Sequence, residues 1–202
     1  AVDDLLAGMR FAIKVFAEGL AHEVAVNEFG KLQQIQHPNV VRSQDLFQIA
    51  GRTCLKMELL SGRQLRALLN EEGRVSRARI DEWLVGLLDA LETLYRAGIV
   101  HRDLKPENIV IEDRGPVIVD FGLASSGEDV LVGGTGRYRP ALAAADSMDP
   151  TIDLFALAVI VHEALTGIHP FGDQKSCRGE PIIDASIDGR LAEALARAMD
   201  PE

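Results

Sequence analysis

The hydrophobic positions near the start of the chain alternate as in a strand and then recur as in a helix. Residues 10–16 are a β-branched and aromatic run that predicts a strand, and Lys14 places a charge on one face of it. From 21 to 36 the apolar side chains recur at roughly helical spacing, until a His-Pro-Asn sequence ends the pattern. Two further apolar runs, 40–50 and 53–59, flank a Gly-Arg turn and predict a hairpin. The Ser-Gly-Arg sequence at 61–63 then predicts a linker.

Helical periodicity dominates the rest of the chain. Apolar residues at 65–69 and 80–95 predict two helices, and a hairpin is expected from 109–111 and 117–119. An Asp-Pro-Thr sequence is typical of a helix start, and it leads into an apolar helix at 152–165 that a glycine ends. The pattern therefore predicts a chain that changes from mostly strands to mostly helices, with the apolar helix in the core.

Composition bounds the class of protein. The 202 residues are 47% hydrophobic, which fits one large domain or two small lobes. The net charge of -10, with acids and bases interspersed, argues against nonspecific binding to nucleic acid or anionic membranes. Cys54 and Cys177 lie far apart without metal-ligand spacing, as expected of reduced thiols. No apolar run reaches the ~20 residues of a membrane helix, so we expect no membrane contact in this segment. The charge pattern and the reduced thiols favour a cytoplasmic protein.

The chemistry is concentrated in the sequence HRDLKPEN at 101–108. Seventeen residues after its Asp103 comes a second carboxylate, Asp120, in an Asp-Phe-Gly sequence. A carboxylate in a catalytic loop can accept a hydroxyl proton, and an amide oxygen five residues on, at Asn108, can bind magnesium. A carboxylate at the end of the next hairpin can hold the same metal. The spacing therefore indicates metal-assisted phosphoryl transfer.

Four motifs occur in order: AIK at 12–14, HRDLKPEN, DFG, and GTGRY at 134–138. Together they resemble the catalytic domain of a eukaryotic-type (Hanks-type) Ser/Thr protein kinase, with a bacterial composition. The resemblance implies an α+β, bilobal protein-kinase-like fold. Residues 1–60 would form an incomplete β-rich N-lobe with strand 3, helix C, strands 4 and 5 and the hinge. Residues 61–202 would form a mainly helical C-lobe with the catalytic loop, the activation segment and helices D to H.

The resemblance also implies catalytic roles. Asp103 would orient the substrate hydroxyl and take its proton as catalytic base, and Lys105 would neutralise charge on the transferred γ-phosphoryl group of ATP. Asn108 and Asp120 would hold Mg2+, because oxygen ligands suit that hard ion. Lys105 together with the Gly-Thr pair of GTGRY is typical of Ser/Thr kinases rather than tyrosine kinases.

The remaining implied residues form a nucleotide site. Lys14 would contact the α and β phosphates, held by an ion pair to Glu28 on the following helix. A lysine on a strand is otherwise a solvated edge residue, and the downstream motifs favour the catalytic interpretation. The adenine would lie against a hinge segment with Met57 as gatekeeper, although that methionine could equally fill the core. The residues expected around adenine are Ala12, Met57, Glu58, Leu60 and Val110.

Two other residues have expected supporting roles. Asp153 would hold the catalytic loop from below, or would simply cap its helix. Arg102 would receive an activation-loop phosphate, or be a plain surface arginine. The short activation segment offers few hydroxyls, so a further hypothesis is that the acidic pair Glu128 and Asp129 imitates that phosphate. A solvated acidic turn is the competing interpretation.

Several departures from the family pattern stand out. No GxGxxG loop precedes the first strand, and a late helix at 191–202 is the last element expected, so we expect a piece of a longer polypeptide fused to further domains. Where the family has Ala-Pro-Glu, the chain has Arg139-Pro140-Ala141. Ser43 stands at a position on the fourth strand that is usually apolar.

Three function classes follow. The favoured one is a Ser/Thr protein kinase that uses ATP and Mg2+ and acts on protein substrates. The second is a pseudokinase or docking module. The missing loop and the altered Ala-Pro-Glu sequence favour it, and the intact Lys14, Asp103, Asn108 and Asp120 oppose it. The third is a small-molecule kinase of related fold, which would lack the docking sequence GTGRY.

Overall fold

The computed structural model describes residues 2–3, 10–16, 22–121, 135–141, 143–144, 147–172 and 176–200. Its strands are β1 Val2–Asp3, β2 Arg10–Val15, β3 Ser43–Ile49, β4 Arg52–Glu58, β5 Arg63–Gln64, β6 Ile109–Glu112 and β7 Gly115–Ile118. Its α-helices are α1 His22–Gln33, α2 Leu65–Glu72, α3 Arg77–Arg96, α4 Thr151–Thr166 and α5 Gly189–Ala198. Two short 3-10 helices are η1 Pro106–Asn108 and η3 Thr135–Tyr138.

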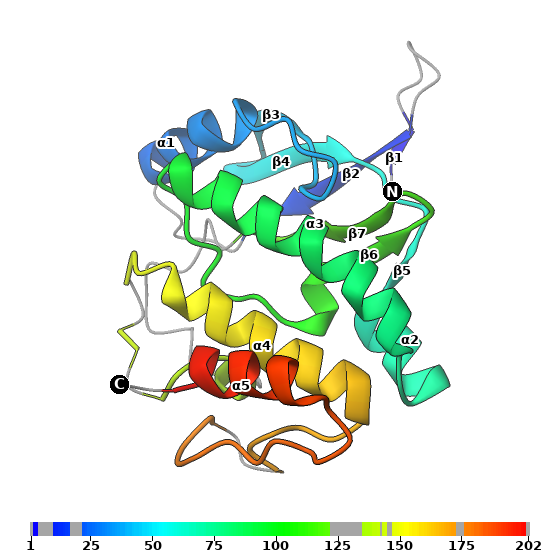
Figure 1. Ribbon diagram of the computed structural model, residues 1–202. Coiled ribbons are helices and arrows are strands. Elements are labelled where there is room, and N and C mark those ends of the chain that lie inside the picture. The colour runs from blue at the N-terminus through cyan, green and yellow to red at the C-terminus, as the bar shows by residue number, and fades with distance from the viewer. Residues whose placement is uncertain are drawn as a thin grey trace.

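The first sheet has the strand order β1-β2-β4-β3, with antiparallel neighbours throughout. α1 lies against β3, and together they make the upper part of the molecule in Figure 1. The predicted strand, helix and hairpin are all present in this part. The hairpin begins at Ser43 rather than at residue 40, because Val41 donates its amide hydrogen to Ile118 O (2.9 Å) on the other sheet. This bond joins the two sheets.

The second sheet has the order β5-β6-β7 and contains the predicted hairpin. β5 forms where the sequence indicated only a linker, with Arg63 paired to Ile111. Gly62 permits this close approach, because a Cβ at that position would lie 2.1 Å from Ile111 O. The linker prediction was therefore wrong at Arg63, where a short strand closes the edge of the sheet.

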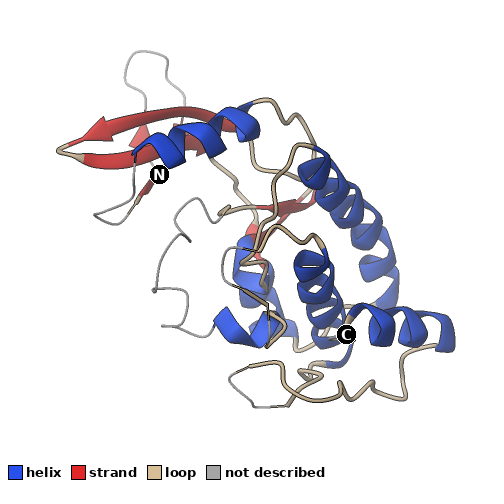
Figure 2. Ribbon diagram, turned by 90° about the vertical axis from the view of Figure 1, so that its left-hand side faces the viewer, coloured by secondary structure: helices blue, strands red, loops and turns tan. Residues whose placement is uncertain are grey.

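The helical part is built around α4, which is apolar on nearly every side and buried along most of its length. α3 and α5 contact it, and α3 also contacts β7, so α3 crosses between the sheets and the lower helices. In Figure 2 the long strands and one helix lie at the top, and the other helices are gathered below them. The predicted core position of the apolar helix is confirmed.

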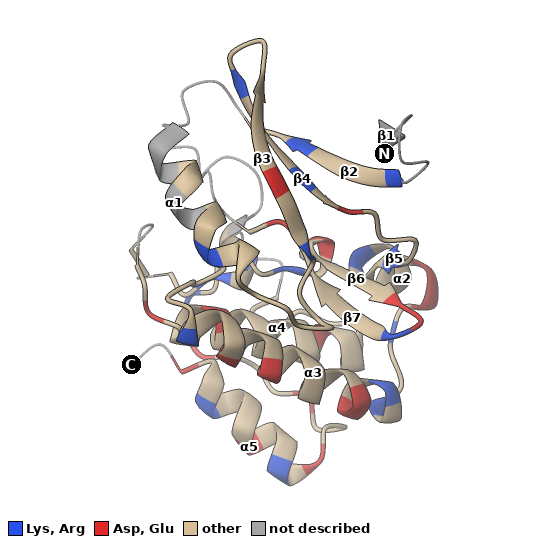
Figure 3. Ribbon diagram, turned by 90° about the horizontal axis from the view of Figure 1, so that it is seen from above, with Lys and Arg blue, Asp and Glu red and all other residues tan. Residues whose placement is uncertain are grey.

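Two helices begin before their predicted starts because polar residues cap them. Ser76 Oγ accepts the Arg79 amide hydrogen at the start of α3, and Asp188 accepts that of Leu191 at the start of α5. The late helix ends at Ala198. Figure 3 shows basic and acidic residues interspersed over both parts, as the sequence indicated. None of the helices in the described part of the chain has the length and apolarity to cross a membrane.

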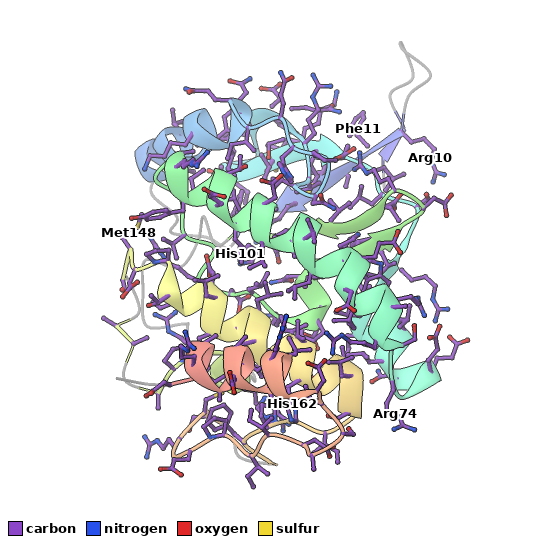
Figure 4. The ribbon with its side chains drawn as sticks, in the orientation of Figure 1. Arg10, Phe11, Arg74, His101, Met148 and His162 are labelled. Atoms are coloured by element: carbon purple, nitrogen blue, oxygen red, sulfur yellow. The ribbon has the colours of Figure 1, made fainter. Side chains whose placement is uncertain are left out.

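A buried histidine anchors the segment that follows α4 (Figure 4). His162 is 1% exposed, its Nδ1 bonds to Ile168 O (3.0 Å), and its Nε2 accepts the Asp184 amide hydrogen (3.1 Å). An imidazole that donates from one nitrogen and accepts at the other is neutral. Burial lowers the pKa of His162, and burial likewise lowers the pKa of His169 in the same part of the fold.

These histidines predict a loss of stability in mild acid. The unfolded chain takes up a proton near pH 6.5, whereas the folded chain resists it until a lower pH, so the unfolding free energy falls as pH drops below about 6.5. Each histidine contributes a slope of at most about 1.4 kcal/mol per pH unit. Urea unfolding between pH 7.5 and 5.5 measures this. His162→Gln, whose amide can both donate and accept, should show a shallower slope; an equal slope would contradict the assignment.

Candidate active site

Asp153 in the first turn of α4 fixes the catalytic loop. It is 5% exposed, its Oδ2 accepts the His101 amide hydrogen (2.6 Å), and its Oδ1 accepts that of Arg102 (2.8 Å). Each carboxylate oxygen of Asp153 thus accepts a hydrogen bond from a backbone amide that would otherwise be buried without a partner. The prediction that Asp153 holds the loop is confirmed, and a plain capping role is excluded.

His101 links the loop to the end of β7. Its ring bonds through Nε2 to Val119 O (2.9 Å), and its Nδ1 accepts the Asp103 amide hydrogen (3.3 Å). The ring centroid lies 5.2 Å from that of Phe121. With one nitrogen donating to a carbonyl and the other accepting, His101 is neutral and positions the loop. These contacts give His101 and Phe121 a packing role.

Asp103 lies in a cluster with two other residues of the loop. Its Oδ2 accepts from Lys105 Nζ (2.7 Å) and from Asn108 Nδ2 (3.2 Å). Asn108 Nδ2 also donates to Asp103 O (2.8 Å), which leaves the amide oxygen of Asn108 on the opposite side. Within the described residues Asp103 Oδ1 is buried and has no hydrogen-bond partner. A buried, unsatisfied carboxylate oxygen is costly, and it can accept a hydrogen bond from a substrate hydroxyl.

Asp120 is brought to the same place through Val119. The Val119 amide donates to Asn108 O (2.9 Å), while the Val119 carbonyl accepts from His101, so both ends of the catalytic loop contact the residue before Asp120. Asp120 and Arg102 have φ values of 63° and 66°. Residues other than glycine seldom adopt this left-handed conformation, and such strain is concentrated at functional sites.

Lys14 points from β2 to Asp120. Its Nζ forms an ion pair with Asp120 Oδ1, and it lies 5.0 Å from the centroid of the Phe16 ring. The alternative of a solvated edge lysine is therefore wrong. Glu28 lies on α1, but its side chain is outside the described residues, so the ion pair between Lys14 and Glu28 stays a prediction.

The expected adenine wall contains the β2–β4 pair. Ala12 is opposite Met57 in the register. Glu58 Oε1 accepts from the Arg42 amide (2.8 Å) and from Arg114 Nη2 (3.2 Å), so that side chain is held by protein partners. Only the backbone of Glu58 could serve a nucleotide. Leu60 and Val110 are partly buried, beyond β4 and on β6.

Asn108 and Asp120 supply only oxygen atoms as metal ligands. The described part of the chain contains no group of three or more His, Cys, Asp or Glu that could bind a metal by itself. An amide and a carboxylate oxygen suit Mg2+, which commonly uses one or two protein ligands together with phosphate oxygens and water. The donor set fits Mg2+ and offers no site for a softer metal.

A second charged cluster was not predicted from the sequence. Arg66 on α2 pairs with Glu107 Oε1 (2.9 Å) and with Glu163 Oε1 on α4 (3.0 Å), and Tyr138 donates its hydroxyl hydrogen to Glu163 Oε2 (2.5 Å). Burial and the neighbouring Glu163 raise the pKa of Tyr138. Although burial opposes it, hydrogen bonding to Arg66 and Tyr138 lowers the pKa of Glu163. The cluster ties the GTGRY segment to the catalytic loop and α4.

Arg139, which directly follows GTGRY, also connects this part of the chain to the catalytic loop. This residue is 8% exposed, and it donates to Arg102 O (3.3 Å) and to Ala144 O. Arg139, in the sequence that replaces the family's Ala-Pro-Glu, thus contacts the catalytic loop directly. Glu128 and Asp129 lie outside the described residues, so their proposed pairing with Arg102 is not tested.

Ser43 is an anomaly beside the adenine wall. It pairs with Met57 in the register, is 6% exposed, and its hydroxyl has no hydrogen-bond partner in the described part of the structure. The sequence departure at this position therefore places a polar group in an apolar environment.

Removing this hydroxyl should stabilise the fold. We expect Ser43→Val to raise the unfolding free energy by about 1 kcal/mol, because an unpaired buried hydroxyl is replaced by apolar volume. Ser43→Ala removes the hydroxyl without filling space and should gain less. Urea unfolding of both variants tests this, and a loss of stability in both would show that the hydroxyl is satisfied.

Comparisons with known proteins agree with the geometry. Residues 4–193 match the family model described as the protein kinase domain. A probable serine/threonine-protein kinase of Bifidobacterium longum is 31% identical over 234 residues, covering 99% of this chain and 30% of that protein. A probable serine/threonine-protein kinase of Corynebacterium efficiens is 30% identical over 190 residues, covering 85% and 29%.

Eukaryotic relatives match as well. Calcium/calmodulin-dependent protein kinase type IV of Mus musculus is 29% identical in an alignment of 174 residues that covers 82% of this chain and 37% of that protein. The chain thus spans about a third of the length of the curated relatives it matches. The α+β, kinase-like fold and the resemblance to Ser/Thr kinases that the motifs predicted are confirmed. The chain belongs to the protein kinase domain family, among relatives that include bacterial serine/threonine-protein kinases.

Proposed function

We propose that this chain is the catalytic domain of a Ser/Thr protein kinase that transfers the γ-phosphoryl group of ATP to protein hydroxyls with Mg2+. The observation that carries the proposal is the buried Asp103 Oδ1 without a partner in the described residues, held beside Asn108 by two hydrogen bonds. The named activities of the bacterial relatives support the choice of serine and threonine.

Asp103 is the base in this proposal. The substrate hydroxyl donates its hydrogen bond to Asp103 Oδ1, and the proton moves to that oxygen as the hydroxyl oxygen bonds to the γ-phosphorus. Lys105, whose Nζ lies 2.7 Å from Asp103 Oδ2, places a positive charge beside the transferred group. The bond from the γ-phosphorus to the bridging oxygen of ATP breaks, and ADP leaves.

The nucleotide would lie between the sheets. Lys14 would bind the α and β phosphates, and Glu28 on α1 would hold Lys14 from the other side. Ala12, Met57 and Val110 would pack on adenine, with the backbone of Glu58 and Leu60 as hydrogen-bond partners. Asn108 and Asp120 would hold Mg2+, which supplies neutralisation of the charge on the phosphate oxygens.

The same proposal extends to the surroundings of the domain. Residues 1–60 would be the N-lobe part and 61–202 the C-lobe part. The substrates would be proteins with accessible serine or threonine. The domain would be fused to further domains and located in the cytoplasm. The cysteines support the location, because Cys54 and Cys177 are both buried and free.

The test uses the protein at its natural length. It is incubated with γ-labelled ATP and a generic Ser/Thr-rich protein, with and without Mg2+, and the labelled acceptor is analysed for phosphoamino acids. We expect Mg2+-dependent label in phosphoserine and phosphothreonine. Label in phosphotyrosine alone would refute the substrate class, and label on aminoglycosides or other small acceptors alone would favour a small-molecule kinase.

A further inference from the structure

The side chain of Arg102 meets a poor hydrogen-bond acceptor. The backbone of Arg102 is fixed on both sides, since its amide donates to Asp153 and its carbonyl accepts from Arg139. Its guanidinium Nη2 contacts Met148 Sδ, and its Nε is buried without a hydrogen-bond partner among the described residues. A thioether sulfur is only a weak acceptor. Among the described residues, the guanidinium of Arg102 therefore has no strong hydrogen-bond acceptor.

Met148 is accessible from solvent. It is 48% exposed and lies in the segment that leads into α4, and Figure 4 labels it at the outer edge of the molecule. Among the other described methionines, Met199 is 0% exposed and Met57 is partly buried. Solvent access governs how fast a thioether is oxidised, so Met148 should be the most reactive of the three.

We propose that Met148 is a site of oxidative modification by hydrogen peroxide, and that Arg102 responds to it. The Met148 sulfur attacks one peroxide oxygen, a sulfur–oxygen bond forms, and the oxygen–oxygen bond breaks. The sulfur loses two electrons, and the proton of the transferred hydroxyl passes to the departing hydroxide. The products are a sulfoxide and one water molecule, and no other reactant is needed. The new sulfoxide oxygen is a strong hydrogen-bond acceptor next to the guanidinium of Arg102.

The modification acts on the catalytic loop through Arg102. Arg102 has a φ of 66°, a conformation that its neighbours must hold in place, and the next residue is Asp103. A charge-assisted hydrogen bond from the guanidinium to the sulfoxide adds a further restraint. Oxidation therefore favours the arrangement in which Asp103 faces the substrate, and it should raise kcat about three- to tenfold while leaving the KM for ATP unchanged.

The first test follows the oxidation itself and does not depend on kinase activity. The protein at its natural length is treated with hydrogen peroxide, and sulfoxide formation at each methionine is followed by peptide mass spectrometry. We expect Met148 to oxidise well before Met199 and Met57, and the melting temperature to rise by a few degrees. Equal oxidation rates in the folded protein, or a fall in melting temperature, would overturn the proposal.

The second test measures catalysis and rests on the proposed kinase function. Peroxide should raise kcat in the unchanged protein, and methionine sulfoxide reductases should reverse the increase. Met148→Leu keeps the volume but cannot be oxidised, so its kcat should not respond. Met148→Gln, which offers a permanent amide oxygen, should show the raised kcat without peroxide. A peroxide response in Met148→Leu, or no increase in Met148→Gln, would contradict the inference even if the protein is an active kinase.

Discussion

Replacing Asp103 with asparagine should lower kcat about a thousandfold, within the 10²–10⁴ range of a general base. The amide has nearly the same shape and retains one oxygen that can accept from Lys105 and Asn108, which contact the carboxylate now. It cannot take a proton from a hydroxyl. The affinity for ATP and the melting temperature should therefore change little, because the loss concerns the reacting proton only.

Steady-state kinetics with a protein acceptor measure this effect. Asp113→Asn provides the matched control, since it makes the same chemical change at an exposed turn residue between β6 and β7. The control should retain full activity. If Asp103→Asn kept more than about a tenth of kcat, Asp103 would be a positioning residue and the assignment of the base would fail.

Replacing Asp153 with alanine should lower both stability and activity. The amides of His101 and Arg102 lose their acceptors at 2.6 and 2.8 Å, and both would be left unpaired beneath the catalytic loop. We expect the unfolding free energy to fall by about 3 kcal/mol, since each unsatisfied buried donor costs about 1–3 kcal/mol. The loop would no longer hold Asp103, so kcat should fall about a hundredfold.

Urea unfolding and kinetics on the same samples separate the two effects. Asp149→Ala is the control, because Asp149 also accepts a backbone hydrogen at the start of α4, from Thr151 (2.9 Å), but is exposed. It should cost much less stability and leave kcat unchanged. An Asp153→Ala protein as stable and active as the Asp149→Ala protein would show that the catalytic loop does not depend on this contact.

Much of the fold could be predicted because its signals are local. The alternation at β2, the helical spacing of α1 and α3 and the all-apolar α4 each arise within one window of sequence. The grouping of Asp103, Asn108 and Asp120 was also predictable. They flank a single hairpin, β6 and β7, so a short stretch of chain brings them together.

The remaining contacts could not be predicted because they join distant segments. Arg66 on α2 and Glu163 on α4 lie 97 residues apart, and only the folded structure reveals their ion pair. The pairing of Lys14 with Asp120 spans 106 residues. Glu107 lies in HRDLKPEN and Tyr138 lies in GTGRY, and this was the one feature of the sequence that could have pointed to the Arg66 cluster. Charged residues at such separations carry no pattern that identifies their partners.

A single-turnover experiment with γ-labelled ATP decides whether this protein transfers the γ-phosphoryl group. The protein at its natural length is mixed with Mg2+, less than one equivalent of ATP and an excess of Ser/Thr-rich acceptor, and bound nucleotide and labelled acceptor are measured together. We expect bound ATP to be converted to ADP as label appears on the acceptor. ATP that stays bound and intact would show a nucleotide-binding pseudokinase and contradict the assignment of Asp103 as catalytic base.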